Sequence, residues 1–416
     1  MNTNLIKKLG TRQGFVGLLV FLLPFLSLVT VWGVSAFSFI IFISALVLFP
    51  EARDALRRHW TVARWVVCAF LFNFLFIFLC YLVRPEALLA TLEKPLRMFL
   101  AVSALALVLA FRPGRNAMWW GVIGGAVAGA LVVAYERFVL GVERPGGGIN
   151  PITYGDMLMC LGLVCLAGAV DLRTSRRAIW AGLGALAGLA GTILTGTRGG
   201  WLALILAALL FVRYSHAVSS KRVRALLVIS FALVAASYFV PDSGVRDRVK
   251  QGAVDVSTYF AGGSAFSNVG IRLELWKAAS LMIAERPLLG ADRAVVIADM
   301  ERYVSEGKID PVVLPMPHFH NDALQAMVTG GVAGALAWLS ILVAPLLFFA
   351  RKLRPQDKPN RQQFGLALAG ILVVSSYFAF GLTEVIFWSV KGSLFYALMV
   401  FMLMGLCLNA KENDGK

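Results

Sequence analysis

The chain has 416 residues, of which 59% are hydrophobic and only 15% are charged, and its mean hydropathy is +0.77. A soluble globular domain is nearer half apolar and a quarter charged, so this composition excludes an ordinary water-soluble domain and indicates a protein in contact with lipid. The net charge of +16 would suit nucleic-acid binding, but the basic residues stand in short clusters between apolar runs, a placement that instead sets membrane topology.

Twelve apolar runs follow one another along the chain, each a candidate for crossing a bilayer, which takes about 20 residues of helix. The shorter runs are expected to tilt or to thin the bilayer locally. We therefore predict an all-α integral membrane protein with about twelve transmembrane helices. The predicted spans are residues 14–31, 34–50, 62–83, 97–111, 118–138, 157–170, 178–195, 201–213, 225–241, 321–350, 364–383 and 388–408.

The basic clusters between these runs predict the orientation of the chain. Counting the runs in order places every cluster on one side, which the positive-inside rule identifies as cytoplasmic, and both termini are expected there too. The first cluster also resembles the start of a signal peptide, but a second apolar run follows at once, so an uncleaved first span is expected. The clusters are Lys7/Lys8/Arg12, Arg53/Arg57/Arg58, Arg112/Arg115, Arg173/Arg176/Arg177, Arg213/Lys221/Arg222/Arg224 and Arg351/Lys352/Arg354/Lys358.

One connection on the opposite side, residues 242–319, is too long for a plain loop. Leu273, Trp276 and Ile283 follow a helical spacing within it, so we predict a small helical cap on the outer face. The five cysteines all lie in apolar runs, and no disulfide is expected. The predicted organisation is spans one to nine in 1–241, the cap in 242–319, and spans ten to twelve with a short cytoplasmic tail in 320–416.

Arg198 is the only charged residue between Ala178 and Phe211, in the turn Thr195-Gly196-Thr197-Arg198-Gly199-Gly200 at the outer end of a span. Glycines permit a tight turn and let backbone N–H groups approach an anion. A charge at a membrane boundary is costly and marks a candidate functional residue. We expect Arg198 to bind an anionic group; the alternative is an arginine that only ends a helix and extends its charge to water.

Arg272 and a pair of histidines lie on the same face. Arg272, in the predicted cap, stands near Glu274, and such a pair is common on helix surfaces, so it is a weak signal alone. His318 and His320 precede span ten, where Asn321 or Asp322 can cap the helix. The positive end of the helix dipole favours a neutral imidazole, which can accept a proton.

Two alternatives apply to the histidines: a purely structural helix start, or zinc binding. No third histidine or cysteine is available on this face, so no metal is expected. Further along the same span, Gly330, Gly331 and Gly334 predict a kink or a close helix contact.

Two arginines and a neutral histidine on one membrane face suit a phosphorylated lipid substrate. Arginine binds diphosphate oxygens through parallel charge-assisted hydrogen bonds, and a polyprenyl diphosphate leaves readily once its developing charge is neutralised. The histidine would take a proton from an acceptor hydroxyl. The sequence has no phosphate-binding loop for ATP and no outer acidic cluster for Mg²⁺ or Mn²⁺, so we expect a glycosyl transfer without a cofactor.

Three motifs resemble those of the bacterial O-antigen ligases and of their wider superfamily with O-antigen polymerases and O-oligosaccharyltransferases. His320-Asn321, followed nine residues later by Gly331-Val332-Ala333-Gly334, resembles the histidine and Gly-x-x-Gly signature of the ligases. The turn around Arg198 is similar to the family's arginine–glycine turn before a span. Arg272-Leu273-Glu274-Leu275-Trp276, with Pro287-Leu288-Leu289-Gly290 beyond it, resembles the opening of the large periplasmic loop.

The resemblance implies an integral-membrane glycosyltransferase of the GT-C type in the bacterial inner membrane, with its active site on the periplasmic face. Such a ligase moves O-antigen polysaccharide from undecaprenyl diphosphate to the lipid A–core oligosaccharide of lipopolysaccharide and inverts the anomeric carbon. Carried over to this chain, Arg198 and Arg272 would hold the diphosphate and His320 would activate the acceptor hydroxyl. Tyr154, Asn321 and Trp276 are candidate glycan-binding residues.

Other functions stay open. An O-antigen polymerase uses the same donor with another lipid-linked glycan as acceptor, and a protein O-oligosaccharyltransferase uses a protein acceptor. The short tail, Lys411–Lys416, argues against the latter. A transporter of an anionic lipid or solute would use Arg198 as an anion site, but the polar residues gather at one face and do not line a path through the membrane midplane.

Overall fold

The computed structural model describes residues 11–84, 89–172, 176–214, 221–239, 245–353 and 360–413. Over these ranges the protein consists of helices and connections, with no strand, which confirms the predicted all-α class. The helices are α2 (Arg12–Leu26), α3 (Gly33–Val47), α4 (Phe49–Arg58), α5 (Trp60–Val83), α6 (Ala90–Leu100), α7 (Val102–Phe111), α8 (Asn116–Phe138), α9 (Pro151–Asp171), α10 (Arg177–Leu194), α11 (Gly199–Arg213), α12 (Lys221–Ser237), α13 (Val245–Phe260), α14 (Asn268–Glu285), α15 (Arg293–Ser305), η2 (Pro311–Val313), α16 (Asp322–Lys352), α17 (Arg361–Gly381), η3 (Ile386–Trp388) and α18 (Val390–Asn413).

Eight helical stretches in the described residues are long and apolar enough to cross a membrane: α5, α6 with α7, α8, α9, α10, α16, α17 and α18. A ninth results if α3 and α4, which are bent by 92°, form one span. Three shorter apolar helices, Arg12–Leu26, Gly199–Arg213 and Arg224–Leu233, fall on three further predicted spans. The fold is that of a multi-pass membrane protein, whereas the total of twelve spans stays a prediction.

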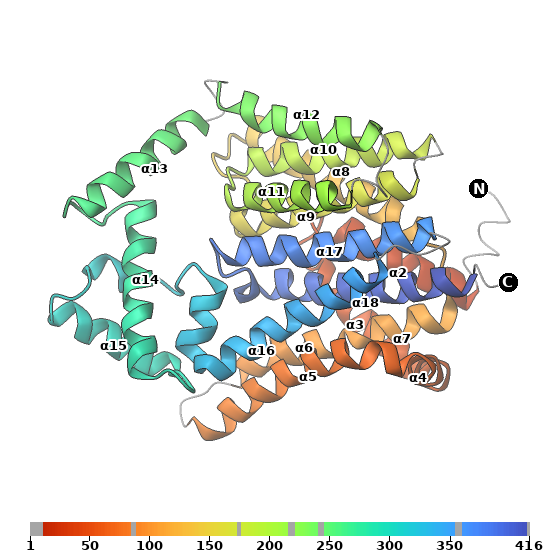
Figure 1. Ribbon diagram of the computed structural model, residues 1–416, viewed down its shortest axis with the longest axis horizontal. Helices are drawn as coiled ribbons and strands as arrows, with labels where there is room; N and C mark the ends of the chain where they lie inside the picture. The colour runs from red at the N-terminus through yellow and green to blue at the C-terminus, as the bar shows by residue number, and fades with distance from the viewer. Residues whose placement is uncertain are drawn as a thin grey trace.

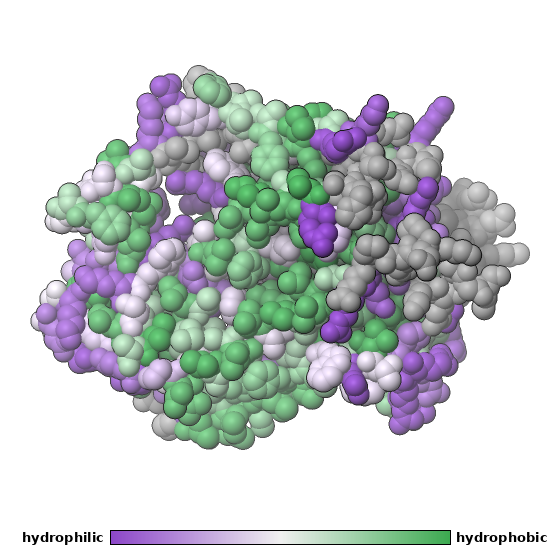
Figure 2. Space-filling model, viewed as in Figure 1, coloured by the Kyte–Doolittle hydropathy of each residue, from purple (hydrophilic) through white to green (hydrophobic). Residues whose placement is uncertain are grey.

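The helices lie side by side in one bundle, with α9, α17 and α18 in its interior (Figure 1). The apolar stretches of these three are 94%, 83% and 100% buried, whereas that of α5 is only 28% buried and faces outward. Figure 2 shows hydrophobic residues over the middle of the visible face and hydrophilic residues gathered towards the two ends. This distribution is expected for a bundle that contacts lipid around its middle.

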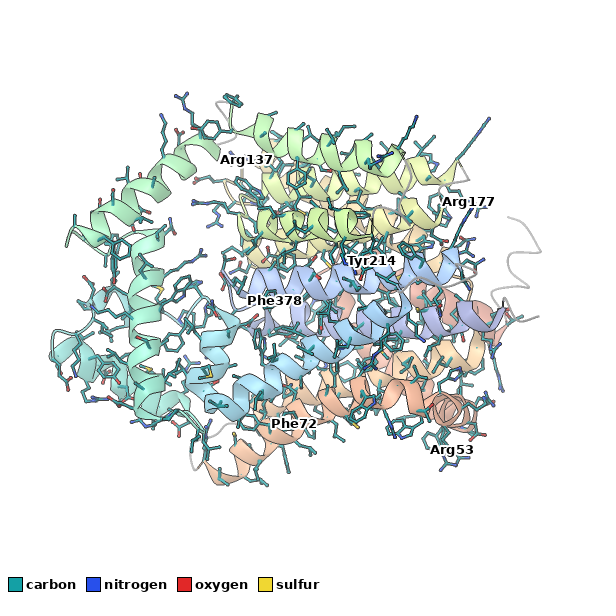
Figure 3. All side chains as sticks on the ribbon, in the orientation of Figure 1. Arg53, Phe72, Arg137, Arg177, Tyr214 and Phe378 are labelled. Atoms are coloured by element: carbon teal, nitrogen blue, oxygen red, sulfur yellow. The ribbon has the colours of Figure 1, made fainter. Side chains whose placement is uncertain are left out.

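The two ends of the bundle differ. Arg53 and Arg177, from two of the predicted cytoplasmic clusters, lie at the same end (Figure 3). The helices α13, α14 and α15 lie at the opposite end, where α11 and α16 begin (Figure 1). We call this opposite end the site end, because it carries Arg198, at the start of α11, and His320, just before α16.

Helices α13 to α15 form a folded unit between α12 and α16, which we call the α13–α15 segment. Leu275 of α14 and Tyr303 of α15 are buried in a hydrophobic cluster separate from that of the bundle, which α16 joins through Val328. Arg286 and Arg302 both pair with Asp299. Burial alone would raise the pKa of Asp299, but the hydrogen bonds from the two arginines outweigh it and lower the pKa below its usual 3.8. The segment thus contains three helices, whereas the predicted cap over 242–319 and its place on the outer face of the membrane stay predictions.

The predicted kink in the tenth span is present in α16 at Gly331, where φ is 59° and ψ is −157°. The chain after α14 is hydrogen-bonded to the bend: the N–H of Val332 donates to Pro287 O and the N–H of Ala291 donates to Val328 O, each with an N···O distance of 2.8 Å. We call these paired stretches, residues 287–291 and 328–333, the α16 junction. A Cβ on Gly331 would lie 2.2 Å from the Leu288 carbonyl carbon, so the junction requires glycine here.

Some sequence predictions fall outside the described residues. They are the boundary at 241–242 between the ninth predicted span and the predicted cap, the basic residues Lys7, Lys8, Arg173, Arg354 and Lys358, and the tail from residue 414 onward.

Candidate active site

Glu384 brings three basic side chains of the site end together. It lies in the short connection between α17 and η3, and its side chain is 8% exposed. Its Oε2 atom is 3.0 Å from His320 Nδ1 and 3.9 Å from Arg272 Nη2, and its Oε1 atom is 3.4 Å from His318 Nε2. Two of the three predicted catalytic residues, Arg272 and His320, therefore meet on one carboxylate.

Glu384 is ionised at neutral pH. Burial by itself raises its pKa, but the hydrogen bond with His320, the charges of both histidines and the N–H of Val385 together lower the pKa below its usual 4.5. With a charged acceptor at 3.0 Å, Nδ1 of His320 carries a hydrogen, so Nε2 is the ring nitrogen that can exchange a proton with a substrate. The ring is thereby prepared to accept a proton at Nε2.

The backbone around His320 is held in an unusual conformation. His320 has a φ of 50°, which is rare for residues other than glycine. Before His320, the Trp276 indole N–H donates to Phe319 O at a distance of 3.0 Å. After it, Asn321 caps α16, and the Asn321 Nδ2 donates to Leu382 O at a distance of 3.1 Å. Strain of this kind persists where the surroundings fix a side chain in one orientation. Trp276 and Asn321 therefore hold His320 in place, and their binding of glycan stays a prediction.

His318 packs beside His320 and shares its carboxylate. The two rings are 4.4 Å apart, and the His318 ring is 5.6 Å from that of Trp388. Burial lowers the pKa of His318 below its usual 6.5; Glu384 acts against this shift, while His320 and Arg272 add to it. His318 is therefore neutral at pH 7.

Arg272 reaches the same group from α14. Burial lowers its pKa from the usual 12.5, Glu384 and Asp156 act in the opposite direction, and Arg144 adds to the lowering. An arginine remains charged even so. Two carboxylates and a second arginine thus lie close enough to Arg272 to act on its charge.

The turn that carries Arg198 is packed tightly against α9. Gly196 has a φ of 71°, and the buried hydroxyl oxygens of Thr195 and Thr197 are 2.8 Å apart. A Cβ on Gly155 of α9 would lie 2.4 Å from each of these oxygens, so no larger residue fits there. Arg198 is itself exposed above this buried base.

Arg198 lies next to the Glu384 group. A Cβ on Gly199 would lie 2.6 Å from the Thr383 hydroxyl oxygen and 3.6 Å from Asp156 Oδ1. On its other side, a Cβ on Gly252 of α13 would lie 3.7 Å from Arg198 Nη1. The turn therefore sits between α13 and the connection that carries Glu384, and all three predicted catalytic residues gather at one end of the bundle.

Asp156 is a further acidic residue of this region. It is fully buried, and neither carboxylate oxygen accepts a hydrogen bond from the described part of the chain. A buried carboxylate without hydrogen bonds is costly, and native proteins retain few of them. Because Asp156 also acts on the charge of Arg272, we count it among the site residues.

Tyr154, a predicted glycan-binding residue, lies in the interior of the helix bundle. Its side chain is fully buried, and its hydroxyl bonds Leu28 O at 2.9 Å and Gly129 O at 3.1 Å. A Cβ on Gly147 would lie 2.4 Å from the tyrosine ring, so the ring supports the glycine-rich loop before α9. Tyr154 therefore shapes this loop, and its binding of glycan stays a prediction.

The same group offers the donors of a metal site. Ligand atoms of His318, His320 and Glu384 lie within 4.8 Å of one another. The sequence offered no third histidine or cysteine on this face, but the carboxylate of Glu384 supplies a third ligand of a type that zinc accepts. Metal binding and proton transfer would compete for the same ring nitrogens.

Glu384 was missed in the sequence, although a signal for it exists. It is the only charged residue between 362 and 390, just as Arg198 is the only one between 178 and 211. A lone charge at the end of an apolar run is costly in both cases and marks a functional candidate. Its pairing with His320, 64 residues earlier in the chain, depends on the packing of α16 against α17.

Two comparisons with known proteins bear on the family. Residues 183–339, which include Arg198, Arg272 and His320, match the family model described as O-antigen ligase. A relative from Haemophilus influenzae, described as an uncharacterized protein, is 21% identical over 344 residues, which cover 81% of this chain and 85% of the relative. The match to the family model supports this chain as a member of the O-antigen ligase family.

Proposed function

We propose that the protein is an O-antigen ligase, which moves O-antigen polysaccharide from undecaprenyl diphosphate to the lipid A–core oligosaccharide of lipopolysaccharide. The observation that carries the proposal is the 3.0 Å contact between His320 Nδ1 and Glu384, with Arg272 on the same carboxylate. A histidine base beside a cation suits the transfer of a sugar from a diphosphate. The match of residues 183–339 to the O-antigen ligase model supports this substrate class.

Arg198 and Arg272 bind the donor diphosphate in this proposal. Arg272 Nη2 is 3.9 Å from Glu384, longer than a direct hydrogen bond, so its donors are available to a phosphate oxygen. Arg198 stands at the start of α11, where the N–H groups of the first helical turn also favour an anion. Two guanidinium groups neutralise the charge that develops on the leaving diphosphate.

His320 acts as the base. The acceptor hydroxyl oxygen attacks the anomeric carbon on the face opposite the diphosphate, and the bond from that carbon to the phosphate oxygen breaks. Its electron pair leaves with undecaprenyl diphosphate, and the hydroxyl proton moves to His320 Nε2. Glu384 stabilises the imidazolium that results, as the carboxylate of a catalytic triad does. A single displacement inverts the anomeric centre, and it needs neither ATP nor a metal ion.

We propose that the reaction takes place on the periplasmic side of the inner membrane, because the positive-inside rule puts the site end on the non-cytoplasmic face. Figure 2 shows an opening between the bundle and the helices labelled α13 and α14 in Figure 1, bordered by hydrophilic residues. We propose that the sugar chains reach His320 through this opening. The α13–α15 segment, which lies beside Arg198 at Gly252, then covers the donor.

Reconstitution with defined substrates tests the function. The purified protein in vesicles, given lipid-linked polysaccharide and rough lipopolysaccharide, is expected to produce a ladder of ligated product without ATP and in the presence of EDTA. His320→Ala, Arg198→Ala and Arg272→Ala are expected to lose the ladder. Arg293→Ala, which removes an exposed cation of α15, is the matched control and should keep it.

The acceptor identifies the reaction. Extension of a second lipid-linked glycan would make the protein a polymerase, and glycosylation of a pilin would make it a protein O-oligosaccharyltransferase. Movement of the lipid across vesicles without any new glycosidic bond would indicate a transporter. Full activity of His320→Ala or Arg198→Ala would refute the roles given to these residues.

A further inference from the structure

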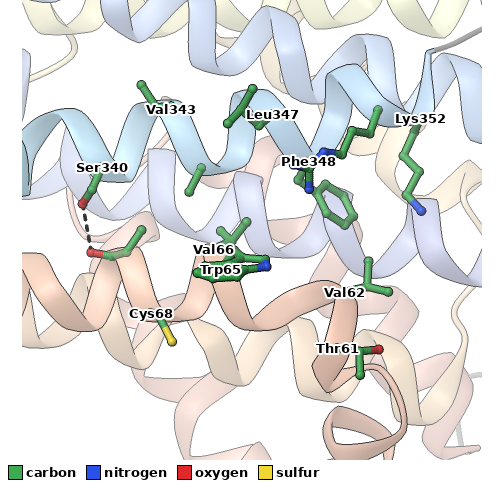
Figure 4. A pocket seen from close by; sticks show the side chains of 13 residues that line it. Thr61, Val62, Trp65, Val66, Cys68, Ser340, Val343, Leu347, Phe348 and Lys352 are labelled. Atoms are coloured by element: carbon green, nitrogen blue, oxygen red, sulfur yellow. Dashed lines mark hydrogen bonds between the residues drawn. The ribbon is translucent and has the colours of Figure 1, made fainter.

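A groove of about 700 Å³ runs between α5 and α16, at the end of these helices away from His320 (Figure 4). Its volume is within the range of small-molecule sites, about 300–1,000 Å³. Apolar side chains make up most of its walls, and two cations stand at one end. The lining residues include Trp65 of α5 and Ser340, Leu347, Phe348, Arg351 and Lys352 of α16.

The packing of α5 against α16 explains where the groove begins. Near the site end the helices are close, since a Cβ on Gly330 would lie 2.9 Å from the Phe76 ring. The hydroxyl of Ser340 donates to Ala69 O over 3.2 Å, the bond drawn in Figure 4. Between this bond and Lys352, larger side chains such as Trp65, Leu347 and Phe348 line the groove, which separates the two helices.

The groove faces the lipid. Trp65 is 62% exposed and Leu347 is 49% exposed, whereas Phe348 is buried and forms part of the inner wall. Apolar side chains exposed on this outer face of the bundle are suited to hydrocarbon chains. The groove therefore opens sideways into the bilayer.

Positive charge is concentrated where the groove reaches the end of α16. Arg351 and Lys352 are its last two helical residues and both line the groove. The Lys352 ammonium lies 5.7 Å from the ring of Phe348, which forms part of the inner wall. A lipid phosphate at this end would meet Arg351 and Lys352, and its chain would meet apolar walls.

We propose that the groove is a binding site for an anionic phospholipid, with an acyl chain between α5 and α16 and the phosphate at Arg351 and Lys352. Basic pockets between transmembrane helices recognise anionic headgroups in this way. The α16 end involved is the one that the positive-inside rule assigns to the cytoplasmic leaflet. The site is thus separate from His320, and the proposal does not depend on the proposed glycosyl transfer.

Quenching by brominated lipids tests the acyl-chain part, because Trp65 lines the groove. The full-length protein is placed in phosphatidylcholine vesicles that contain either brominated phosphatidylglycerol or brominated phosphatidylcholine at equal mole fractions. The Trp65 signal is the difference between the tryptophan fluorescence of the wild type and that of Trp65→Phe. Trp180→Phe gives the same difference for a tryptophan of α10 that is 54% exposed and lies outside the groove.

Brominated phosphatidylglycerol is expected to quench the Trp65 signal at a lower mole fraction than brominated phosphatidylcholine does. The preference for the anionic lipid should be on the order of five-fold per cation. The Trp180 signal should respond to the two lipids in the same way in the wild type and in Arg351→Gln with Lys352→Gln, because those two cations line the groove and Trp180 does not. Arg351→Gln with Lys352→Gln should abolish the Trp65 preference, whereas Arg176→Gln with Arg177→Gln, an equal loss of charge at the same end, should preserve it. Equal quenching by both lipids, a preference that survives in the first double variant, or a Trp65 signal insensitive to either lipid would overturn the proposal.

Discussion

The substitution Glu384→Gln tests the partnership of His320 and Glu384. It keeps the size of the side chain but removes the negative charge that pairs with His320 Nδ1 at 3.0 Å. A hydrogen bond to a charged group contributes about 1.5–3 kcal/mol, and the 8% exposure of Glu384 leaves little room for water to replace it. Since about 1.4 kcal/mol corresponds to a tenfold change in rate, kcat is expected to fall on the order of 10- to 100-fold.

Initial rates of ladder formation, measured over a range of donor concentrations, provide the assay. The KM for the donor should change little, because Arg198 and Arg272 remain in place. Glu306→Gln is the matched control, since Glu306 pairs with Lys308 in an exposed ion pair away from His320, and it should keep the wild-type kcat. A folded Glu384→Gln protein with unchanged kcat would refute the role of Glu384 in proton transfer.

Four further outcomes are expected. Added Zn²⁺ should inhibit, because the His318, His320 and Glu384 ligand atoms lie within 4.8 Å of one another; EDTA should restore the rate, and His318→Ala should weaken the inhibition. Asp156→Asn should raise the unfolding temperature, since it replaces a buried carboxyl group that has no hydrogen-bond partner among the described residues, yet lower kcat; an unchanged or raised kcat would leave Asp156 no role in catalysis. Gly331→Ala should cost at least about 1–3 kcal/mol of stability because its φ is 59°, whereas Gly114→Ala, which meets nothing within 4 Å, should leave the unfolding temperature unchanged. Acid should destabilise the α13–α15 segment, because the pKa of Asp299 is lowered in the folded protein: the stability that its ionised form contributes is present above pH 3.8 and is lost as the pH falls through the lowered value. Amide exchange in α14 and α15 should therefore become faster only below pH 3.8. This pH dependence should disappear in Asp299→Asn.

The apolar runs predicted the helices of the bundle because a chain in lipid must satisfy its backbone hydrogen bonds within each span. They were less informative about where helices begin. The sixth predicted span starts at residue 157, but α9 starts at Pro151, because the Asn150 side chain accepts hydrogen bonds from the first turn and proline suits that position. The six added residues carry Gly155 and Asp156, which face the site, so hydropathy alone omitted part of the site.

The candidate site could be predicted in its cations and its base but not in its carboxylates. Arg198 and His320 are unusual in their local sequence, one as a lone charge and the other within a helix start. Glu384 acquires its role only when α17 ends beside the start of α16. In the same way, Trp276 and Asn321 were candidates by residue type, whereas their hydrogen bonds to backbone carbonyls are set by the tertiary fold.

Glu384 is held between two buried helices, whereas some other parts of the site belong to helices outside the buried interior of the bundle. Its connection joins α17 to η3 and α18, and the apolar stretches of α17 and α18 are 83% and 100% buried, whereas Arg272 and Gly252 belong to α14 and α13, which lie at one end of the bundle (Figure 1). In the proposed mechanism, the carboxylate that supports proton transfer is thus held by buried helices, whereas the α13–α15 segment, which we propose to cover the donor, lies outside that buried interior. Exchange of the α13–α15 segment between homologues is accordingly the way to seek altered sugar preference, with the α17–η3 connection left unchanged.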